Sequence, residues 1–215
     1  MSAEKWYKVL LNGESFHGGS MKWSLPDGNI PGEWHEVYGD LRFCSQGLHV
    51  TNDPAHWFSL GARVYLTECE GLVKKEHDKA CFRRVRLLRE LDNDELRELR
   101  IAGDGKLTVT GNDFAFVFGS CEVTARDSSQ VTALESSQVE ARDSSQVTAW
   151  ESSQVEAWES SQVEAKGSGQ ITAKGSSTIN IFSSKCSVTQ SDQALVIDRT
   201  CCPPKILTGW KGEMT

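Results

Sequence analysis

The chain lacks the features that mark nucleic-acid-binding and membrane proteins. Its 215 residues carry 23 Lys and Arg against 30 Asp and Glu, so the formal net charge is −7. Basic residues gather only at Lys74–Lys75 and Arg83–Arg86, which is too little for the basic footprint of a nucleic-acid binder. No apolar run approaches the roughly 20 residues of a membrane-spanning helix, and Met1–Lys8 has no signal-peptide core. We therefore expect neither nucleic acid nor membrane as a partner, and a cytoplasmic location.

The cysteines also lack a regular framework. There are seven, an odd number, and their spacing is irregular. Reduced thiols in a cytosolic protein are the simplest interpretation. Cys201 and Cys202 are adjacent and precede Pro203–Pro204, so they do not have the Cys-x-x-Cys spacing of zinc ligands. We expect no metal and no cofactor in the interpretation we favour.

The chain does have a repeat, an eight-residue unit that recurs from Glu122 to Ser183. A fixed short period is the signature of a solenoid, in which each unit stacks on its neighbours. Because side chains alternate along a strand, Val131 and Ala133 share the inner face, and Gln130 and Thr132 share the outer one. Two inner slots run without a polar residue: Leu107, Ala115, Val123, Val131, Val139, Val147, Val155, Val163, Ile171, Ile179, and Val109, Val117, Ala125, Ala133, Ala141, Ala149, Ala157, Ala165, Ala173, Ile181.

A single unit cannot bury its apolar face, so each coil must contain two or three units. Two units give a flat two-sheet roll of about sixteen residues per coil, which suits small Val, Ala and Ser side chains better than a triangular coil of about twenty-four. The predicted chain is mainly β: a small α+β domain over 1–104, a β-solenoid of octapeptide repeats over 105–200, and a C-terminal cap or tail over 201–215. After Ile181 the register slips by one residue, and Val188 and Val196 keep the period.

The outward slots hold the candidate interaction surface. With sixteen residues per coil, one stack contains Arg126, Arg142, Trp158 and Lys174, and the other contains Leu134, Trp150, Lys166 and Phe182. Exposed aromatic side chains mark contact surfaces, so we take Leu134, Trp150, Trp158, Arg126 and Arg142 as that surface. The alternative is that the Trp rings only cover neighbouring strands. Asp127, Asp143 and Glu159 stack at one turn, either as solvated carboxylates, which we favour, or as oxygen ligands for a divalent cation.

The repeats resemble the sixteen-residue repeats of bacterial ice-nucleation proteins, which pair two Ala-x-x-Ser-x-x-x-Thr-like octads. The resemblance covers the C-terminal half and implies a solenoid fold. An ice-binding-like surface is therefore one alternative function. Such a surface needs a regular Thr ladder, and here Glu140 and Glu156 interrupt it.

The N-terminal half reads as short strands with a strand at 63–70, a charged loop at 71–79, a strand at 80–88 and a helix at 92–101. It contains four motifs in order: Trp23-Ser-Leu-Pro26, Pro31-Gly-Glu-Trp34, Cys44-Ser-Gln-Gly-Leu-His49 and Glu68-Cys-Glu-Gly71. With them it resembles an uncharacterised domain of bacteria and phages that is common in actinobacteria. That resemblance implies a phage or bacterial origin and no established activity.

A second resemblance concerns chemistry. The segments 16–20 (Phe-His-Gly-Gly-Ser), 47–51 (Gly-Leu-His-Val-Thr) and 64–68 (Val-Tyr-Leu-Thr-Glu) are similar in order to motifs of ADP-ribosyltransferases. The resemblance implies NAD as cofactor, with His17 at the nicotinamide ribose and Glu68 at the oxocarbenium-like centre or the acceptor. Gly19 stands where that family has Thr, and His49 where it has Tyr. His49 on a short strand is more often a packed, hydrogen-bonded residue than a catalyst.

No catalytic constellation is intact in the sequence, and Cys44 has no His and acid ordered around it. We therefore favour a non-enzymatic structural or interaction module that displays a rigid β-solenoid to a protein partner or to a second copy. An NAD-dependent enzyme in the N-terminal domain is the alternative, with the ice-binding-like surface as a second one.

Overall fold

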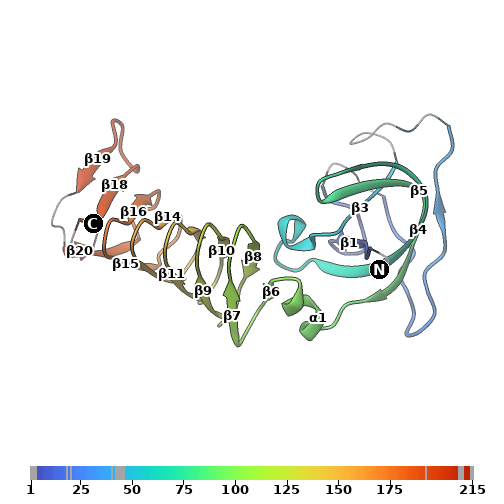
Figure 1. Cartoon of the computed structure of the whole chain (residues 1–215), viewed down its shortest axis with the longest axis horizontal. Coiled ribbons are helices and arrows are strands. Elements are labelled where there is room, and N and C mark those ends of the chain that lie inside the picture. Colours follow the sequence, from blue (N-terminus) through green and yellow to red (C-terminus); the bar gives the residue numbers. More distant parts are fainter. Residues whose placement is uncertain are drawn as a thin grey trace. The chain divides into compact units, whose positions relative to one another are not determined.

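The protein is described by a computed structural model that covers residues 4–17, 19, 21–39, 41, 47–191, 193–207 and 211–213. The chain divides into two compact units, Met1–Leu99 and Arg100–Thr215 (Figure 1). The predictions for Gly18, Ser20, Cys44 and Trp210 lie outside the described residues.

The N-terminal unit is a small sheet that closes on itself. Its strands are β1 (Tyr7–Leu10), β2 (His35–Glu36), β3 (Leu48–Thr51), β4 (Arg63–Glu76) and β5 (Lys79–Glu90). The order is β2-β5-β3-β1-β4, and β4 also pairs with β5. A 3₁₀ helix, η1 (Pro54–Trp57), and a short helix, α1 (Asn93–Glu98), complete the unit. Asp92 and Glu95 form a capping box at the start of α1.

The charged loop expected at 71–79 is instead the turning end of a long hairpin. β4 continues to Glu76 and β5 begins at Lys79, with Glu76 opposite Lys79. The side chains of residues 71–77 are all exposed. The prediction was wrong because a strand with neither face buried shows no alternation of apolar and polar residues.

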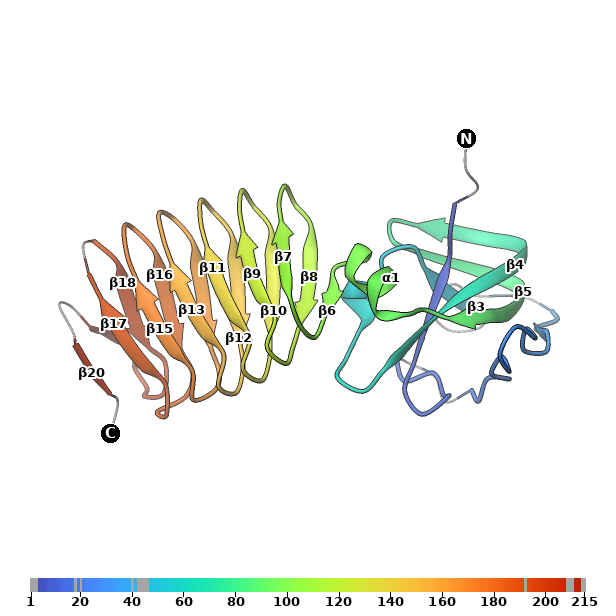
Figure 2. The same ribbon diagram turned by 90° about the horizontal axis from the view of Figure 1, so that it is seen from below.

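The C-terminal unit is a β-solenoid built from two parallel sheets (Figure 2). The first sheet contains β6 (Ile101–Ala102), β8 (Phe114–Val117), β10 (Gln130–Ala133), β12 (Gln146–Ala149), β14 (Gln162–Ala165), β16 (Thr178–Ile181), β18 (Leu195–Asp198) and β19 (Lys205–Leu207). The second contains β7 (Lys106–Val109), β9 (Glu122–Ala125), β11 (Gln138–Ala141), β13 (Gln154–Ala157), β15 (Gln170–Ala173), β17 (Ser187–Gln190) and β20 (Lys211–Glu213).

The register confirms the two-unit coil. Val131 pairs with Val147 and Val139 with Val155, and the solenoid makes about 6 turns, about 16 residues apart, from residue 101 to 198. The first coil thus begins slightly before the predicted start at residue 105. The predicted slip also occurs, because Ile171 pairs with Val188 and Ile179 with Val196.

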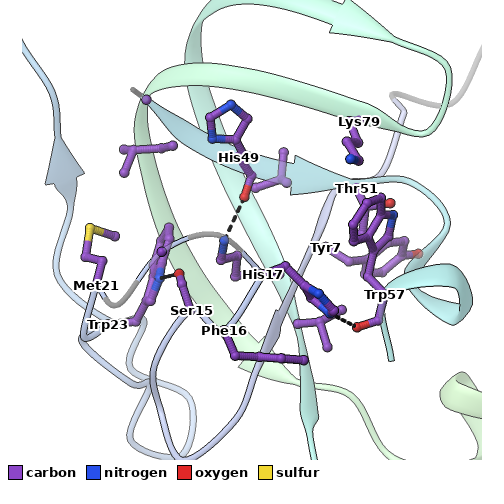
Figure 3. A pocket seen from close by; sticks show the side chains of 16 residues that line it. Tyr7, Ser15, Phe16, His17, Met21, Trp23, His49, Thr51, Trp57 and Lys79 are labelled. Atoms are coloured by element: carbon purple, nitrogen blue, oxygen red, sulfur yellow. Dashed lines mark hydrogen bonds between the residues drawn. The ribbon is translucent and has the colours of Figure 1, made fainter. Parts of the chain in front are cut away.

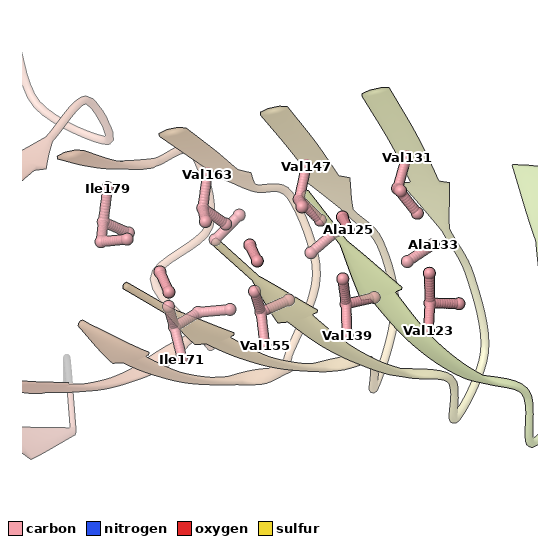
Figure 4. Close-up of a cluster of buried hydrophobic side chains, with 14 of the residues drawn as sticks. Val123, Ala125, Val131, Ala133, Val139, Val147, Val155, Val163, Ile171 and Ile179 are labelled. Carbon is pink, nitrogen blue, oxygen red and sulfur yellow. The ribbon is translucent and has the colours of Figure 1, made fainter. Parts of the chain in front are cut away.

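The core of the solenoid is the pair of predicted inner slots. Val and Ala side chains from both sheets point toward one another between the layers (Figure 4). The residues of both slots are buried from Val109 onward, and Leu107 packs against them half-buried. Each buried Val contributes about 1.5–3 kcal/mol relative to an exposed one, so the stability comes from many equal increments along the stack.

The turns use acidic residues in an unusual backbone conformation. Asp127, Glu135, Asp143, Glu151 and Glu159 all have positive φ, between 51° and 57°, where glycine is favoured. Their carboxylates accept hydrogen bonds from backbone amides one coil earlier: Asp143 accepts from the amide of Asp127 at 3.1 Å, and Glu159 from that of Asp143 at 2.6 Å. The predicted carboxylate stack therefore forms, and it binds amides. Within the described residues no group of three or more His, Cys, Asp or Glu has the geometry to hold a metal ion.

The C-terminal segment adds one strand to the C-terminal edge of each solenoid sheet. β19 pairs antiparallel with β18, and β20 pairs antiparallel with β17. Both additions reverse the parallel order of the stack. Among the helices that the structure describes, none is long and apolar enough to span a membrane.

Candidate functional site

A pocket of about 320 Å³ lies in the N-terminal unit. Its walls come from β1, residues 15–17, 19, 21 and 23, β3, η1 and the start of β5 (Figure 3). The lining residues are Tyr7, Lys8, Val9, Ser15, Phe16, His17, Gly19, Met21, Trp23, Gly47, Leu48, His49, Val50, Thr51, Trp57 and Lys79. The pocket thus contains two of the three residues that the sequence suggested for chemistry, His17 and His49.

His17 is held at the rim by η1. Its Nε2 lies 2.8 Å from the carbonyl oxygen of Trp57, and its ring stands edge-on to the Trp57 ring with centroids 5.3 Å apart. A carbonyl oxygen only accepts hydrogen bonds, so Nε2 carries the proton, and Nδ1 of the neutral ring is then an acceptor. The His17 side chain is exposed.

Lys8 is the most perturbed group in the pocket. Its side chain is half-buried, and Nζ donates to the carbonyl oxygen of His49 at 2.9 Å and lies 5.0 Å from the centroid of Trp23. Desolvation disfavours the charged ammonium and lowers the pKa of Lys8 to about 8. The pocket therefore holds a lysine that titrates near physiological pH.

His49 and Lys79 add two further basic groups. Burial is the main cause that lowers the pKa of the half-buried His49, and the nearby charge of Lys8 lowers it further. Lys79 places Nζ 3.6 Å from the centroid of the Trp57 ring, whose Nε1 donates to Asp78 at 2.6 Å. Because an indole face attracts cations, Trp57 fixes the position of this ammonium.

Glu68 does not join the histidines. It lies on β4, does not line the pocket, and forms an ion pair with Arg86 at 2.5 Å. The structure thus brings His17 and His49 to one pocket and leaves Glu68 elsewhere. The NAD-dependent interpretation needs His17 and Glu68 at one centre, and it stays a prediction that this geometry does not favour.

Sequence reasoning missed Lys8 and Lys79. Both occupy strand positions where a polar residue is ordinary. The available signal was a charged residue between Tyr7 and Val9, since β1 is otherwise buried at every position. The contribution of Trp57 was also missed, because it depends on the tertiary contact between η1 and His17.

On the solenoid, the predicted stacks form at the ends of the strands. Lys166 Nζ lies 5.2 Å from the centroid of Trp150 and 5.7 Å from that of Phe182. Trp150 is 42% exposed and Phe182 is 44% exposed. Leu134, one coil before Trp150, is half-buried. This set of Leu134, Trp150, Lys166 and Phe182 is called the aromatic edge below.

The other stack is more polar. Trp158 lies between Arg142, at 6.0 Å from its ring centroid, and Lys174, at 4.0 Å. Trp158 is half-buried, so the expectation that it is an exposed aromatic was wrong: the two cations cover its faces. Arg126, one coil before Arg142, is exposed.

The Glu residues between these strands pair with the cations. Arg142 forms an ion pair with Glu140, and Lys174 pairs with Glu156 at 2.6 Å. The Lys174 ammonium is the main cause that lowers the pKa of Glu156. Ion pairs therefore interrupt the Thr ladder that an ice-binding-like surface would need.

Comparison of the chain with protein-family models, with curated proteins and with solved structures found no match.

Proposed function

We propose that the solenoid is a non-enzymatic interaction module, and that the aromatic edge is its contact surface for a protein partner. The observation that carries the proposal is the exposure of Trp150 and Phe182, held on either side of Lys166 by the coil repeat. Aromatic and cationic side chains in a cluster are typical of the residues that dominate protein–protein binding.

The scaffold supports this role because it is already ordered. Each strand pairs in register with the coils before and after it, as β12 does with β10 and β14. A rigid surface loses little conformational entropy on binding, so more of the contact energy appears as affinity. The cation–π contacts of Lys166 hold the exposed rings in one arrangement.

We also infer that the protein acts in a reducing compartment, such as the cytoplasm of a bacterium or of a phage-infected host. Cys69, Cys186, Cys201 and Cys202 are free thiols. Burial raises the pKa of Cys69 and of Cys186 to about 11, so both stay protonated and unreactive near neutral pH. These thiols support a packing role.

The test compares three versions of the full chain as bait in a bacterial lysate: wild type, Trp150→Ala/Phe182→Ala, and the control Ile206→Ala. Ile206 is a suitable control because it is 64% exposed on the same unit but outside the aromatic edge. We expect wild type and the control to retain the same protein, and the double variant to lose at least about 30-fold in affinity, the equivalent of about 2 kcal/mol. Equal retention by all three versions would contradict the proposal.

Self-association is the other outcome that this surface allows, and light scattering separates it. If the partner is a second copy, the wild-type mass rises with concentration and the double variant stays monomeric. If the partner is a different protein, both remain monomeric and only the capture differs.

A further inference from the structure

We propose that the pocket of the N-terminal unit binds a small organic anion that carries a planar ring, with Lys8 and Lys79 as the counter-charges. This inference is independent of the solenoid's role.

The charge of the lining is opposite to that of the chain. The formal net charge of the protein is −7, yet the charged side chains that line the pocket are those of Lys8 and Lys79. Among the sixteen described lining residues there is no Asp or Glu. A concave surface with charge of one sign concentrates ligands of the opposite sign.

The two lysines have no carboxylate partner among the described residues, although other lysines do. Lys75 pairs with Glu4 at 2.7 Å, Lys166 with Glu164 at 2.7 Å, and Lys174 with Glu156 at 2.6 Å. Lys8 and Lys79 instead face the rings of Trp23 and Trp57. A half-buried ammonium without a counter-ion is costly, and a bound anion would offset that cost.

Part of the remaining wall is apolar, and the pocket is small. Phe16, Met21, Trp23 and Trp57 supply ring and thioether surface to the lining (Figure 3). The volume of about 320 Å³ is at the lower end of the roughly 300–1,000 Å³ typical of ligand sites. It suits one substituted ring with one anionic group better than a dinucleotide.

Titration calorimetry with phenyl phosphate, inorganic phosphate and phenol tests the two parts of the ligand separately. We expect phenyl phosphate to bind the full chain, and the ring alone or the phosphate alone to bind at least tenfold more weakly. Lys8→Met and Lys79→Met should each weaken phenyl phosphate at least tenfold. Lys74→Met and Glu68→Ala are the matched controls, since neither residue lines the pocket, and both should bind like wild type.

The pH dependence of the affinity for phenyl phosphate distinguishes a loss of the Lys8 charge from a loss of folding. Lys8 donates to the carbonyl oxygen of His49 on β3. The other basic side chains of the lining are those of His49, of Lys79 on β5, and of His17 between β1 and β2. Because the free Lys8 titrates near pH 8, affinity for phenyl phosphate should fall as pH rises from 7 to about 10 in wild type. A folded Lys8→Met variant should show a much shallower fall.

The proposal is overturned if phenyl phosphate does not bind at millimolar concentration, if phenol binds equally well, or if inorganic phosphate binds equally well. It is also overturned if both lysine variants, shown by circular dichroism to be folded, bind like the controls.

Discussion

The buried serines of the solenoid fall into two groups, according to whether the side-chain hydroxyl forms a hydrogen bond. Ser137 and Ser153 donate to the carbonyl oxygens of Leu134 and Trp150, each at 2.8 Å. The hydroxyls of Ser129, Ser145, Ser161 and Ser177 are buried and have no hydrogen-bond partner in the described part of the chain. The serines of the first group follow strands of the sheet that contains β10 and β12, and those of the second group follow strands of the other sheet. Serines at the same position of the repeat therefore contribute differently to stability.

This difference predicts opposite effects of the same substitution. Ser153→Ala should lower the free energy of unfolding by about 1 kcal/mol, because the Trp150 carbonyl loses its donor. Ser145→Ala should leave stability unchanged or raise it, because it removes a buried hydroxyl that makes no bond. Urea denaturation of both variants checks this, and an equal loss in the two would contradict the assignment.

Lys8 predicts a dependence of stability on pH. Desolvation lowers the pKa of Lys8 in the folded chain to about 8 from the usual 10.5, so the unfolded chain binds the proton more tightly. Wild-type stability should therefore rise as pH increases from about 8 to 10.5, and the cost should be fully present below pH 8. Lys8→Met should be more stable than wild type at pH 7, with a margin that shrinks toward pH 10.5 in thermal denaturation. A margin that does not change with pH would show that packing, and not charge, is responsible.

At the scale of elements, the turns of the solenoid combine strain with a hydrogen bond. Asp143 has φ of 56°, and its carboxylate accepts the amide of Asp127 one coil earlier. Gly111, Gly119 and Gly175 occupy the equivalent turn position with φ between 63° and 65°, where no strain arises. At this turn position the chain thus uses either a glycine, which is not strained, or an acidic residue whose carboxylate binds the turn of the preceding coil.

A pair of substitutions separates these two contributions. Asp143→Ala should destabilise the solenoid by about 2 kcal/mol, because it keeps the left-handed strain and loses the hydrogen bond. Asp143→Gly loses the same bond but relieves the strain, so it should be about 1 kcal/mol less destabilising than Ala. Chemical denaturation measures the difference. If the Asp143→Ala variant is as stable as the Asp143→Gly variant, the left-handed backbone conformation at this turn does not destabilise the solenoid.

The elements that could be predicted from sequence are those with a buried face. Val131 and Ala133 alternate with polar residues because one side of each strand is packed, and even the register slip at Val188 and Val196 was visible. Leu72 and Lys74 gave no such signal because both faces of that part of β4 are in solvent. The pocket was only partly predictable: His17 and His49 were marked by the motif resemblance, whereas Lys8 and Trp57 come to line the same pocket only through tertiary packing.

At the scale of the whole molecule, the two compact units predict separable stability. A fragment of residues 100–215 contains every solenoid strand and both antiparallel edge strands. We expect its circular dichroism spectrum to show β structure, and its melting transition to match one of those of the intact chain. A disordered spectrum would show that the solenoid needs the N-terminal unit to fold.

The sixteen-residue coil has a consequence for how such a chain can change in length. Inserting two octads adds one coil, moves the ends about 4.8 Å further apart, and leaves every later residue in its own sheet. Inserting a single octad would transfer every later unit to the opposite sheet. Phe182 would then continue the stack of Arg142 and Trp158 instead of that of Trp150. The length of the solenoid can therefore change without disrupting the aromatic edge only when octads are gained or lost in pairs. An odd number of octads would divide the aromatic edge between the two sheets.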